Sequence, residues 1–159
     1  MEKKELKTDY LFGSYEELEA ADRNLVDASL KATTHSYSPY SHFRVGAAVL
    51  LADGTIVQGA NQENAAYPSG LCAERTAVFS AQAQYPEQAV KALALVGCNE
   101  QGVTAIPAWP CGACRQVILE VEERYHQPIR ILVASSKGVY IFHSIKDLLP
   151  FCFVDGNMK

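Results

Sequence analysis

The chain has 159 residues, which is enough for a single domain with one substantial core. Hydrophobic residues make up 48% and charged residues 20%, a composition that excludes an intrinsically disordered protein. The formal net charge of −4 argues against a nucleic acid polymer as partner, since such binding depends on Lys and Arg. A small neutral substrate is easier to accommodate.

The first ten residues, "MEKKELKTDY", contain no apolar run that would serve as a signal peptide, and no stretch is long enough to cross a bilayer. The five cysteines are an odd number, which without a secretory signal indicates a reducing compartment. Clustered cysteines in that setting more often bind a metal or do chemistry than form disulfides. We therefore expect a cytoplasmic protein with no membrane partner.

Residues 1–15 are expected to form a loosely held N-terminal arm, and residues 16–159 a single folded domain. A first helix is predicted over residues 15–34, because apolar side chains recur there at helical spacing (Leu18, Ala21, Leu25, Ala28 and Ala32). Two β-compatible runs follow in residues 44–60. They flank Asp53-Gly54, which predicts a hairpin.

A second helix is predicted from Cys72 to about Gln84, a buried strand over residues 91–97 and a third helix over residues 110–125. Two strands follow with a short link between them ("IRILVAS" and "GVYIFH"), and "SIKDLLP" closes the chain as a short helix. So short a link favours antiparallel pairing. The order of elements predicts an α/β fold, a three-layer α-β-α sandwich around a mixed sheet of five strands. No Gly-x-Gly-x-x-Gly turn follows the first strand, so a dinucleotide-binding fold is not expected.

The segment "PCGACRQ" places two cysteines, Cys111 and Cys114, on one face of the third helix. With Cys72 they give three candidate metal ligands. Three protein ligands with a fourth position left for water is the arrangement of a catalytic zinc, whereas four ligands close a structural one. Cys98 and Cys152 have no partner at ligand spacing and are interpreted as core or strand cysteines.

Cys72 precedes Glu74 at the start of the second helix. Because Cβ vectors tilt toward a helix N-terminus, Cys72 can hold the metal while Glu74 reaches a water on it. Helix N-termini also favour negative charge, which lowers the pKa of a thiol there. Arg75 is a cation in the same turn, where it opposes the helix dipole. It is predicted to hydrogen-bond a ligand sulfur, with a surface salt bridge as the alternative.

A C-x-x-C pair alone would also fit a redox motif or half of a zinc ribbon. A redox motif leaves Cys72 and Glu74 unexplained, and no second C-x-x-C is present to complete a ribbon. The combination of C-x-E with P-C-x-x-C resembles the zinc deaminase signature. The flanking segments "SPYSHFRVGAAVL", "NQENAAYPSGLCAERTA" and "LLPFCF" are similar to the small cytidine deaminases of pyrimidine salvage, over residues 15–153. Cys as the first ligand resembles the tetrameric branch of that family.

This resemblance implies one Zn²⁺ per chain, a homotetramer, and a cytidine deaminase-like catalytic domain over residues 16–159. The implied reaction is hydrolytic deamination of cytidine and deoxycytidine to uridine and deoxyuridine with release of ammonia. Glu74 would move protons between the water, ring N3 and the departing amine. The resemblance also assigns substrate contacts: Asn61 and Glu63 to the ribose, Phe43 and the backbone of Ala73 to the base, and Phe153 to a neighbouring subunit's site.

The chain departs from the family pattern in its longer N-terminal arm and in the bulky Phe151 near its end. Two other functions remain open at this stage. One is deamination of a modified nucleoside such as a blasticidin-like antibiotic. The other is a catalytically silent zinc-binding scaffold, which would have no use for Glu74.

Overall fold

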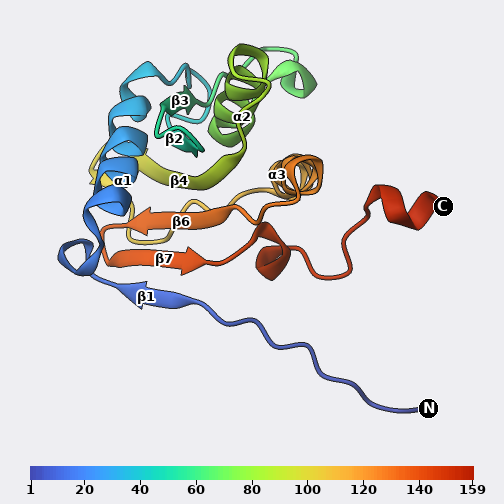
Figure 1. The fold of residues 1–159 in the computed structure, drawn as a ribbon. Helices are drawn as coiled ribbons and strands as arrows, with labels where there is room; N and C mark the ends of the chain where they lie inside the picture. Colours follow the sequence, from blue (N-terminus) through green and yellow to red (C-terminus); the bar gives the residue numbers. More distant parts are fainter.

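The fold is a mixed β-sheet between two helical layers, as the computed structural model of residues 1–159 shows (Figure 1). Helix α1 (Ala20–Ala32) covers one face of the sheet, while α2 (Ala73–Gln84) and α3 (Gly112–Tyr125) cover the other. The predicted three-layer α/β sandwich is confirmed. None of the helices combines the length and the apolar character needed to cross a membrane.

The sheet has seven strands, and the prediction of five was wrong. Their order is β1-β7-β6-β4-β2-β3, with β5 paired to β4, and only the β4–β6 pair is parallel. Their bounds are β1 Leu11–Gly13, β2 Arg44–Leu51, β3 Ile56–Ala60, β4 Val90–Asn99, β5 Gly102–Val103, β6 Arg130–Ser135 and β7 Gly138–Phe142. The two strands that were missed, β1 and β5, have three and two residues, too few to show an alternating pattern.

The other predicted elements differ from the observed ones mainly at the chain ends. The β2–β3 hairpin, the antiparallel β6–β7 pair and the helix that follows Cys72 are all confirmed. The first helix begins at Ala20, not at residue 15, because a capping box of Ser14 and Glu17 starts a separate 3₁₀ turn, and the backbone of Leu18 and Glu19 after it is extended. The helix predicted to close the chain is a single 3₁₀ turn, Ile145–Leu148, and a further 3₁₀ turn, Asp155–Met158, follows it.

Small residues in the sheet let the helices approach closely. A Cβ on Gly59 of β3 would lie 2.3 Å from the backbone nitrogen of Ala77 and 2.7 Å from the carbonyl oxygen of Ala73. The first two turns of α2 therefore rest directly on the backbone of β3. This contact fixes the N-terminal end of α2, where Cys72 is the N-cap residue.

The N-terminal arm contributes one strand to the sheet. Residues 1–10 contain no helix or strand, and the beginning of the chain extends away from the body of the molecule (Figure 1). Leu11–Gly13 then pairs with β7 as the edge strand β1, with Phe12 opposite Tyr140.

Candidate metal centre and catalytic cleft

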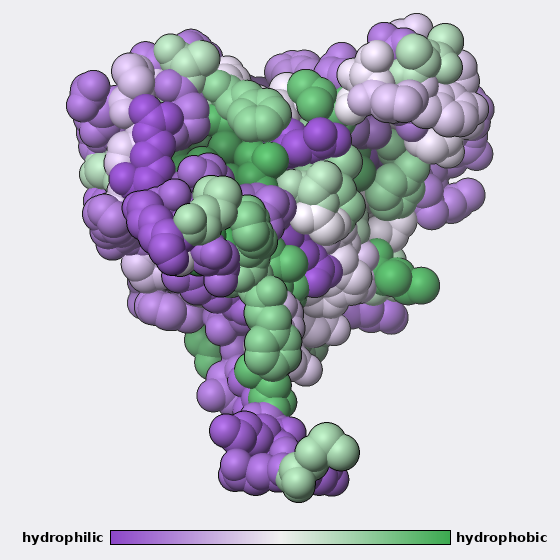
Figure 2. Space-filling view, turned by 90° about the vertical axis from the view of Figure 1, so that its right-hand side faces the viewer, coloured by the Kyte–Doolittle hydropathy of each residue, from purple (hydrophilic) through white to green (hydrophobic).

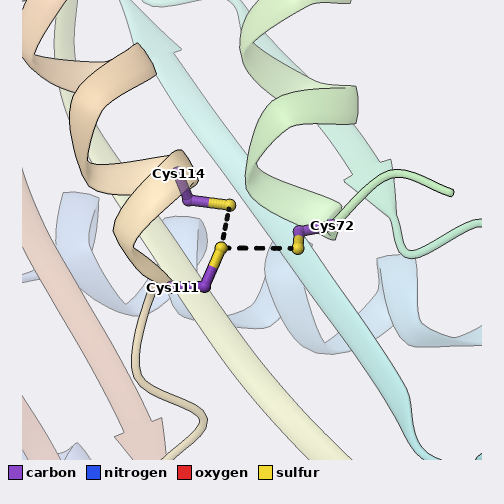
Figure 3. Close-up of side chains that lie close together, drawn as sticks. All are labelled: Cys72, Cys111 and Cys114. Atoms are coloured by element: carbon purple, nitrogen blue, oxygen red, sulfur yellow. Dashed lines mark hydrogen bonds between the residues drawn. The ribbon is translucent and has the colours of Figure 1, made fainter. Parts of the chain in front are cut away.

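Three cysteine sulfurs meet between the N-terminal ends of α2 and α3 (Figure 3). Cys72 and Cys111 are the N-cap residues of the two helices, and Cys114 lies in the first turn of α3. The Sγ atoms of Cys72 and Cys111 are 3.7 Å apart, and those of Cys111 and Cys114 are 3.3 Å apart. A tetrahedral zinc with Zn–S bonds near 2.3 Å requires S···S separations of about 3.8 Å, so the trio fits zinc.

The burial of the three cysteines leaves the site open on one side. Cys114 is fully buried, Cys72 is half-buried and Cys111 is exposed. Cys72 and Cys111 also line a large cleft. The trio thus offers three sulfur ligands at the edge of a cavity, which would suit a catalytic zinc with one open position.

The sulfurs share their protons unevenly when no metal is bound. The pKa of Cys72 falls to about 5, chiefly because its thiolate accepts a hydrogen bond from Cys114, with further help from Arg75. The pKa of Cys114 rises, because its thiol is the donor to Cys72 and is also shielded from water. One proton is therefore lost easily and another is retained until a metal displaces it.

Arg75 lies beside the metal centre, where its guanidinium contacts the sulfur of Cys72. Its Nη2 is 3.9 Å from Cys72 Sγ, and it forms no ion pair with a carboxylate. The contact that the sequence predicted is therefore present, and the alternative of a surface salt bridge is not. The hydrogen bond to Cys72 raises the pKa of Arg75, so the guanidinium stays charged.

Replacing Arg75 with Ala is expected to raise the pKa of Cys72 toward its ordinary value of 9.0, because the thiolate loses a positively charged neighbour. At a pH between 5 and 9.0 less thiolate is present, so alkylation of the metal-free protein by iodoacetamide becomes slower. The measurement is the alkylation rate against pH. Arg124→Ala, at the far end of α3, is the matched control, and an unchanged profile in Arg75→Ala would contradict the role of Arg75.

Glu74 occupies the first turn of α2 and lines the same cleft. The residue is only 3% exposed, and this burial raises the pKa of its carboxyl to about 7. The negative charge of Cys72 adds to the effect. A carboxyl whose pKa lies near neutrality can both accept and return a proton, which is the property of a general acid–base group.

The cleft has a volume of about 750 Å³, large enough for a small heterocyclic ligand. Four of the residues predicted to bind substrate line it (Phe43, Asn61, Glu63 and Ala73), together with Glu74 and Arg75. Phe153 does not line it: its side chain is 58% exposed in the C-terminal tail. The structure therefore brings the four residues to one cavity and leaves Phe153 outside it.

Asn61 and Glu63 also hold the loop that carries Phe43. The Oδ1 atom of Asn61 accepts from the backbone nitrogen of Val45 at 2.8 Å, and its Nδ2 donates to the carbonyl of Phe43 at 2.9 Å. Glu63 accepts from the backbone nitrogens of Tyr40 and Ser41. These contacts fix the aromatic ring of Phe43 at the cleft, a role that the sequence did not reveal.

Two further residues near the C-x-x-C segment were missed. Trp109 lies two residues before Cys111 and lines the cleft. Its position next to the C-x-x-C motif was the feature of the sequence that could have indicated this. Arg115 donates from Nε to the carbonyl of Pro110 at 2.8 Å and from Nη1 to the carbonyl of Leu148. Arg115 thereby ties the start of α3 to the C-terminal segment.

Comparison with known proteins agrees with this site. The family model described as "Cytidine and deoxycytidylate deaminase zinc-binding region" matches residues 19–126, which include all three cysteines and Glu74. A cytidine deaminase of Halalkalibacterium halodurans is 37% identical over 135 residues, covering 85% of this chain and 96% of the relative. One from Sporosarcina psychrophila is 43% identical over 129 residues, covering 81% and 88%.

Solved structures give the same result. The crystal structure of cytidine deaminase from Burkholderia pseudomallei superposes with a TM-score of 0.71 at 39% identity, covering 82% of this chain and 97% of that one. That of Mycobacterium tuberculosis superposes with a TM-score of 0.66 at 33% identity, covering 86% and 99%. The fold and site define a zinc-dependent deaminase class. Within it, the chain belongs to the cytidine deaminase family.

Proposed function

We propose that this protein is a zinc-dependent enzyme that hydrolyses cytidine and deoxycytidine to uridine and deoxyuridine with release of ammonia. The observation that carries the proposal is the meeting of three cysteine sulfurs with a buried Glu74 at one wall of a cleft. A scaffold that only bound zinc would gain nothing from burying a carboxylate there, because burial of an unpaired charge is costly.

In the proposed mechanism Cys72, Cys111 and Cys114 hold one Zn²⁺ per chain. The bound ion supplies a Lewis acid that makes water a nucleophile near neutral pH. Glu74 accepts a proton from the water that attacks C4 of the cytosine ring and gives it to ring N3. It then carries the second proton of the water to the C4 amine, which leaves as ammonia. One carboxylate can serve as base and acid because it lies between the water and the ring.

The substrate side of the proposal assigns Phe43 and the backbone of Ala73 to the base, and Asn61 and Glu63 to the ribose. The Oδ1 atom of Asn61 accepts hydrogen bonds from Ser36 and Val45, and one Nδ2 hydrogen is donated to Phe43. The second Nδ2 hydrogen is therefore the group that can donate to a ribose hydroxyl. Glu63 is partly exposed. Its Oε2 accepts from the backbone nitrogens of Tyr40 and Ser41, while its Oε1 accepts from the Ser41 hydroxyl and retains a lone pair for a ribose hydroxyl.

The charges of the cleft favour a nucleoside over a nucleotide. Arg75 is the only basic residue that lines the cavity, and it is engaged with Cys72, whereas Glu63 and Glu74 are acidic. A phosphate would therefore find no free cation. We expect kcat/KM for deoxycytidylate to be at least about tenfold lower than for deoxycytidine, because the negatively charged phosphate would gain no ion pair and would be repelled by the acidic side chains. Equal values for the two substrates would contradict this.

The proposed function is tested by metal analysis of the purified protein together with loss of cytidine absorbance. One zinc per chain and steady turnover are expected. Zinc without turnover would favour the scaffold, and faster turnover of a blasticidin-like antibiotic than of cytidine would favour the modified nucleoside. Active protein with substoichiometric zinc would contradict the three-sulfur site.

Assembly and location extend the proposal. We infer a homotetramer in which Phe153 reaches a neighbouring subunit's site: its carbonyl accepts from Gln116 at 2.9 Å, while its side chain is largely exposed and does not line its own cleft. We also infer a role in pyrimidine salvage in the cytoplasm, where the five free cysteines stay reduced. Light scattering gives the subunit number, and a monomer with full activity would overturn the role of Phe153.

We also propose that residues 16–159 form the catalytic domain and that residues 1–15 form an N-terminal arm.

A further inference from the structure

Five aromatic side chains connect the N-terminal arm to the cleft. On the arm, Phe12 packs on Tyr140 of β7 with ring centroids 4.5 Å apart, and Tyr10 packs on Tyr140 and Phe142 at 5.8 Å and 5.5 Å. On the other side, Trp109 meets Tyr140 edge-on at 5.0 Å and Phe142 at 6.1 Å. Tyr140 and Phe142 therefore lie between the arm and Trp109.

The pairing of β1 fixes which side chains join this cluster. Phe12 is opposite Tyr140 and Leu11 opposite Ile141, so alternation puts Tyr10 and Phe12 on the face of Tyr140 and Leu11 on the other face. Gly138 also makes room for Phe12, because a Cβ there would lie 2.8 Å from its ring. The arm is thus seated by side-chain packing and not only by backbone pairing.

Figure 2 shows the side of the molecule on which the chain begins. The molecule narrows at its lower end, where the chain begins, and hydrophobic side chains form a band up the face above it. Tyr10 and Phe12 are each about half exposed, as is Trp109. Half-exposed rings in contact with one another exclude water from their shared edges.

Trp109 brings the cluster to the site, because it lines the cleft two residues before Cys111. Its neighbour Ala108 shares the same wall with Phe43: a Cβ on Gly97 would lie 2.8 Å from the methyl of Ala108 and 2.7 Å from the ring of Phe43. A shift of Trp109 therefore changes the wall against which a planar heterocycle would bind.

We propose that the N-terminal arm positions Trp109, with Tyr10 and Phe12 as positioning residues that act through Tyr140, and that Trp109 is a substrate-contacting wall of the cleft. The first part is independent of the reaction. The second rests on the proposed nucleoside deamination, since it assigns the indole to contact with the bound nucleoside.

The first part is tested with the intrinsic fluorescence of Trp109, which is the only tryptophan of the chain. In the full-length variant with Tyr10→Ala and Phe12→Ala, the emission is expected to shift to the red and acrylamide quenching to increase, because water reaches the indole edge. Leu11→Ala, on the same strand but 70% exposed on the opposite face, is the matched control and should leave both unchanged.

A conservative variant separates ring packing from general damage. Tyr10→Phe with Phe12→Tyr keeps both rings and is expected to restore the wild-type emission. Circular dichroism and thermal unfolding of each variant confirm that the domain is folded, and Tyr10→Ala alone serves if the double variant is not. An emission spectrum of the alanine variant identical to that of the wild type would overturn the proposal.

The second part is tested by kinetics with cytidine. Trp109→Ala is expected to raise KM about tenfold, as loss of an aromatic–base contact implies. The Tyr10→Ala and Phe12→Ala variant is expected to raise KM about threefold, with kcat changed less, because aromatic packing is weakened and Glu74 is untouched. A fall in kcat at constant KM would overturn the assignment of Trp109 as a binding wall.

The two kinds of failure are distinguishable. If the wild type does not deaminate cytidine, the proposed function fails, while the fluorescence shift still reports whether the arm positions Trp109. If the wild type is active and KM is unchanged in Trp109→Ala, only the role of Trp109 as a wall fails.

Discussion

Replacing Glu74 with Gln is expected to lower kcat for cytidine by about a thousandfold or more, the usual scale of general acid–base catalysis. The amide keeps the size and burial of the carboxyl but cannot accept a proton from water. Binding of zinc should persist at one ion per chain, because the three sulfurs are untouched. Ammonia release and zinc content, measured on the same preparation, give the two halves of the result.

Glu120→Gln is the matched control for this prediction. Glu120 is exposed on α3 and makes no hydrogen bond, so the same change of charge should leave kcat near the wild-type value. A Glu74→Gln variant that deaminates cytidine at the rate of this control would rule out the proton transfer assigned to Glu74. Loss of zinc together with activity would instead indicate that Glu74 stabilises the metal centre.

The layers of the fold were predictable because each depended on local pattern. The helical spacing in residues 18–32 and the turn at Asp53-Gly54 each depend on residues that are close together in the chain, and both elements were found where expected. The boundary of α1 was missed because a capping box at Ser14 competes with continuation of the helix toward the N-terminus. Strands β1 and β5 were missed because two or three residues carry no period.

The site was predictable where chemistry limits the choice of residue. A thiolate ligand must be cysteine, and the spacing of Cys111 and Cys114 puts both on one helix face, so the trio with Cys72 followed from the sequence. Contacts that depend on tertiary packing did not follow. Nothing local to Trp109 indicates that Tyr140, 31 residues later, packs against its ring, or that Tyr10 supports Tyr140 from the arm.

The same limit applies to the polar loop. Asn61 and Glu63 were recognised only through the resemblance, as groups for the ribose. The hydrogen bond between Asn61 and Ser36 spans 25 residues and that between Glu63 and Ser41 spans 22, so no short-range sequence pattern predicts them. The structure adds that these side chains shape the loop around Phe43 before any substrate binds. Substitution of either would therefore disturb both the loop and the proposed ribose contacts.

Removing the metal is expected to lower Tm as well as to abolish deamination. The three sulfurs would hold the ion between the N-terminal ends of α2 and α3, and Cys72 and Cys111 are 39 residues apart in the chain. A ligand present at a hundred times its Kd stabilises the folded state by about 2.7 kcal/mol. For a chain of this size that corresponds to a Tm difference of about 5–10 °C between zinc-loaded protein and protein treated with a chelator.

Cys114→Ala should reproduce the effect of the chelator without added reagent. Cys114 is fully buried and hydrogen-bonds the other two sulfurs, so its loss removes one ligand and leaves the surface unchanged. We expect zinc content and turnover to fall below detection, and Tm to become insensitive to added zinc. Cys152→Ala, at a cysteine outside the trio, should keep one zinc per chain and its zinc-dependent Tm. Retention of zinc and turnover in Cys114→Ala would exclude Cys114 as a ligand, and with it the open three-sulfur site.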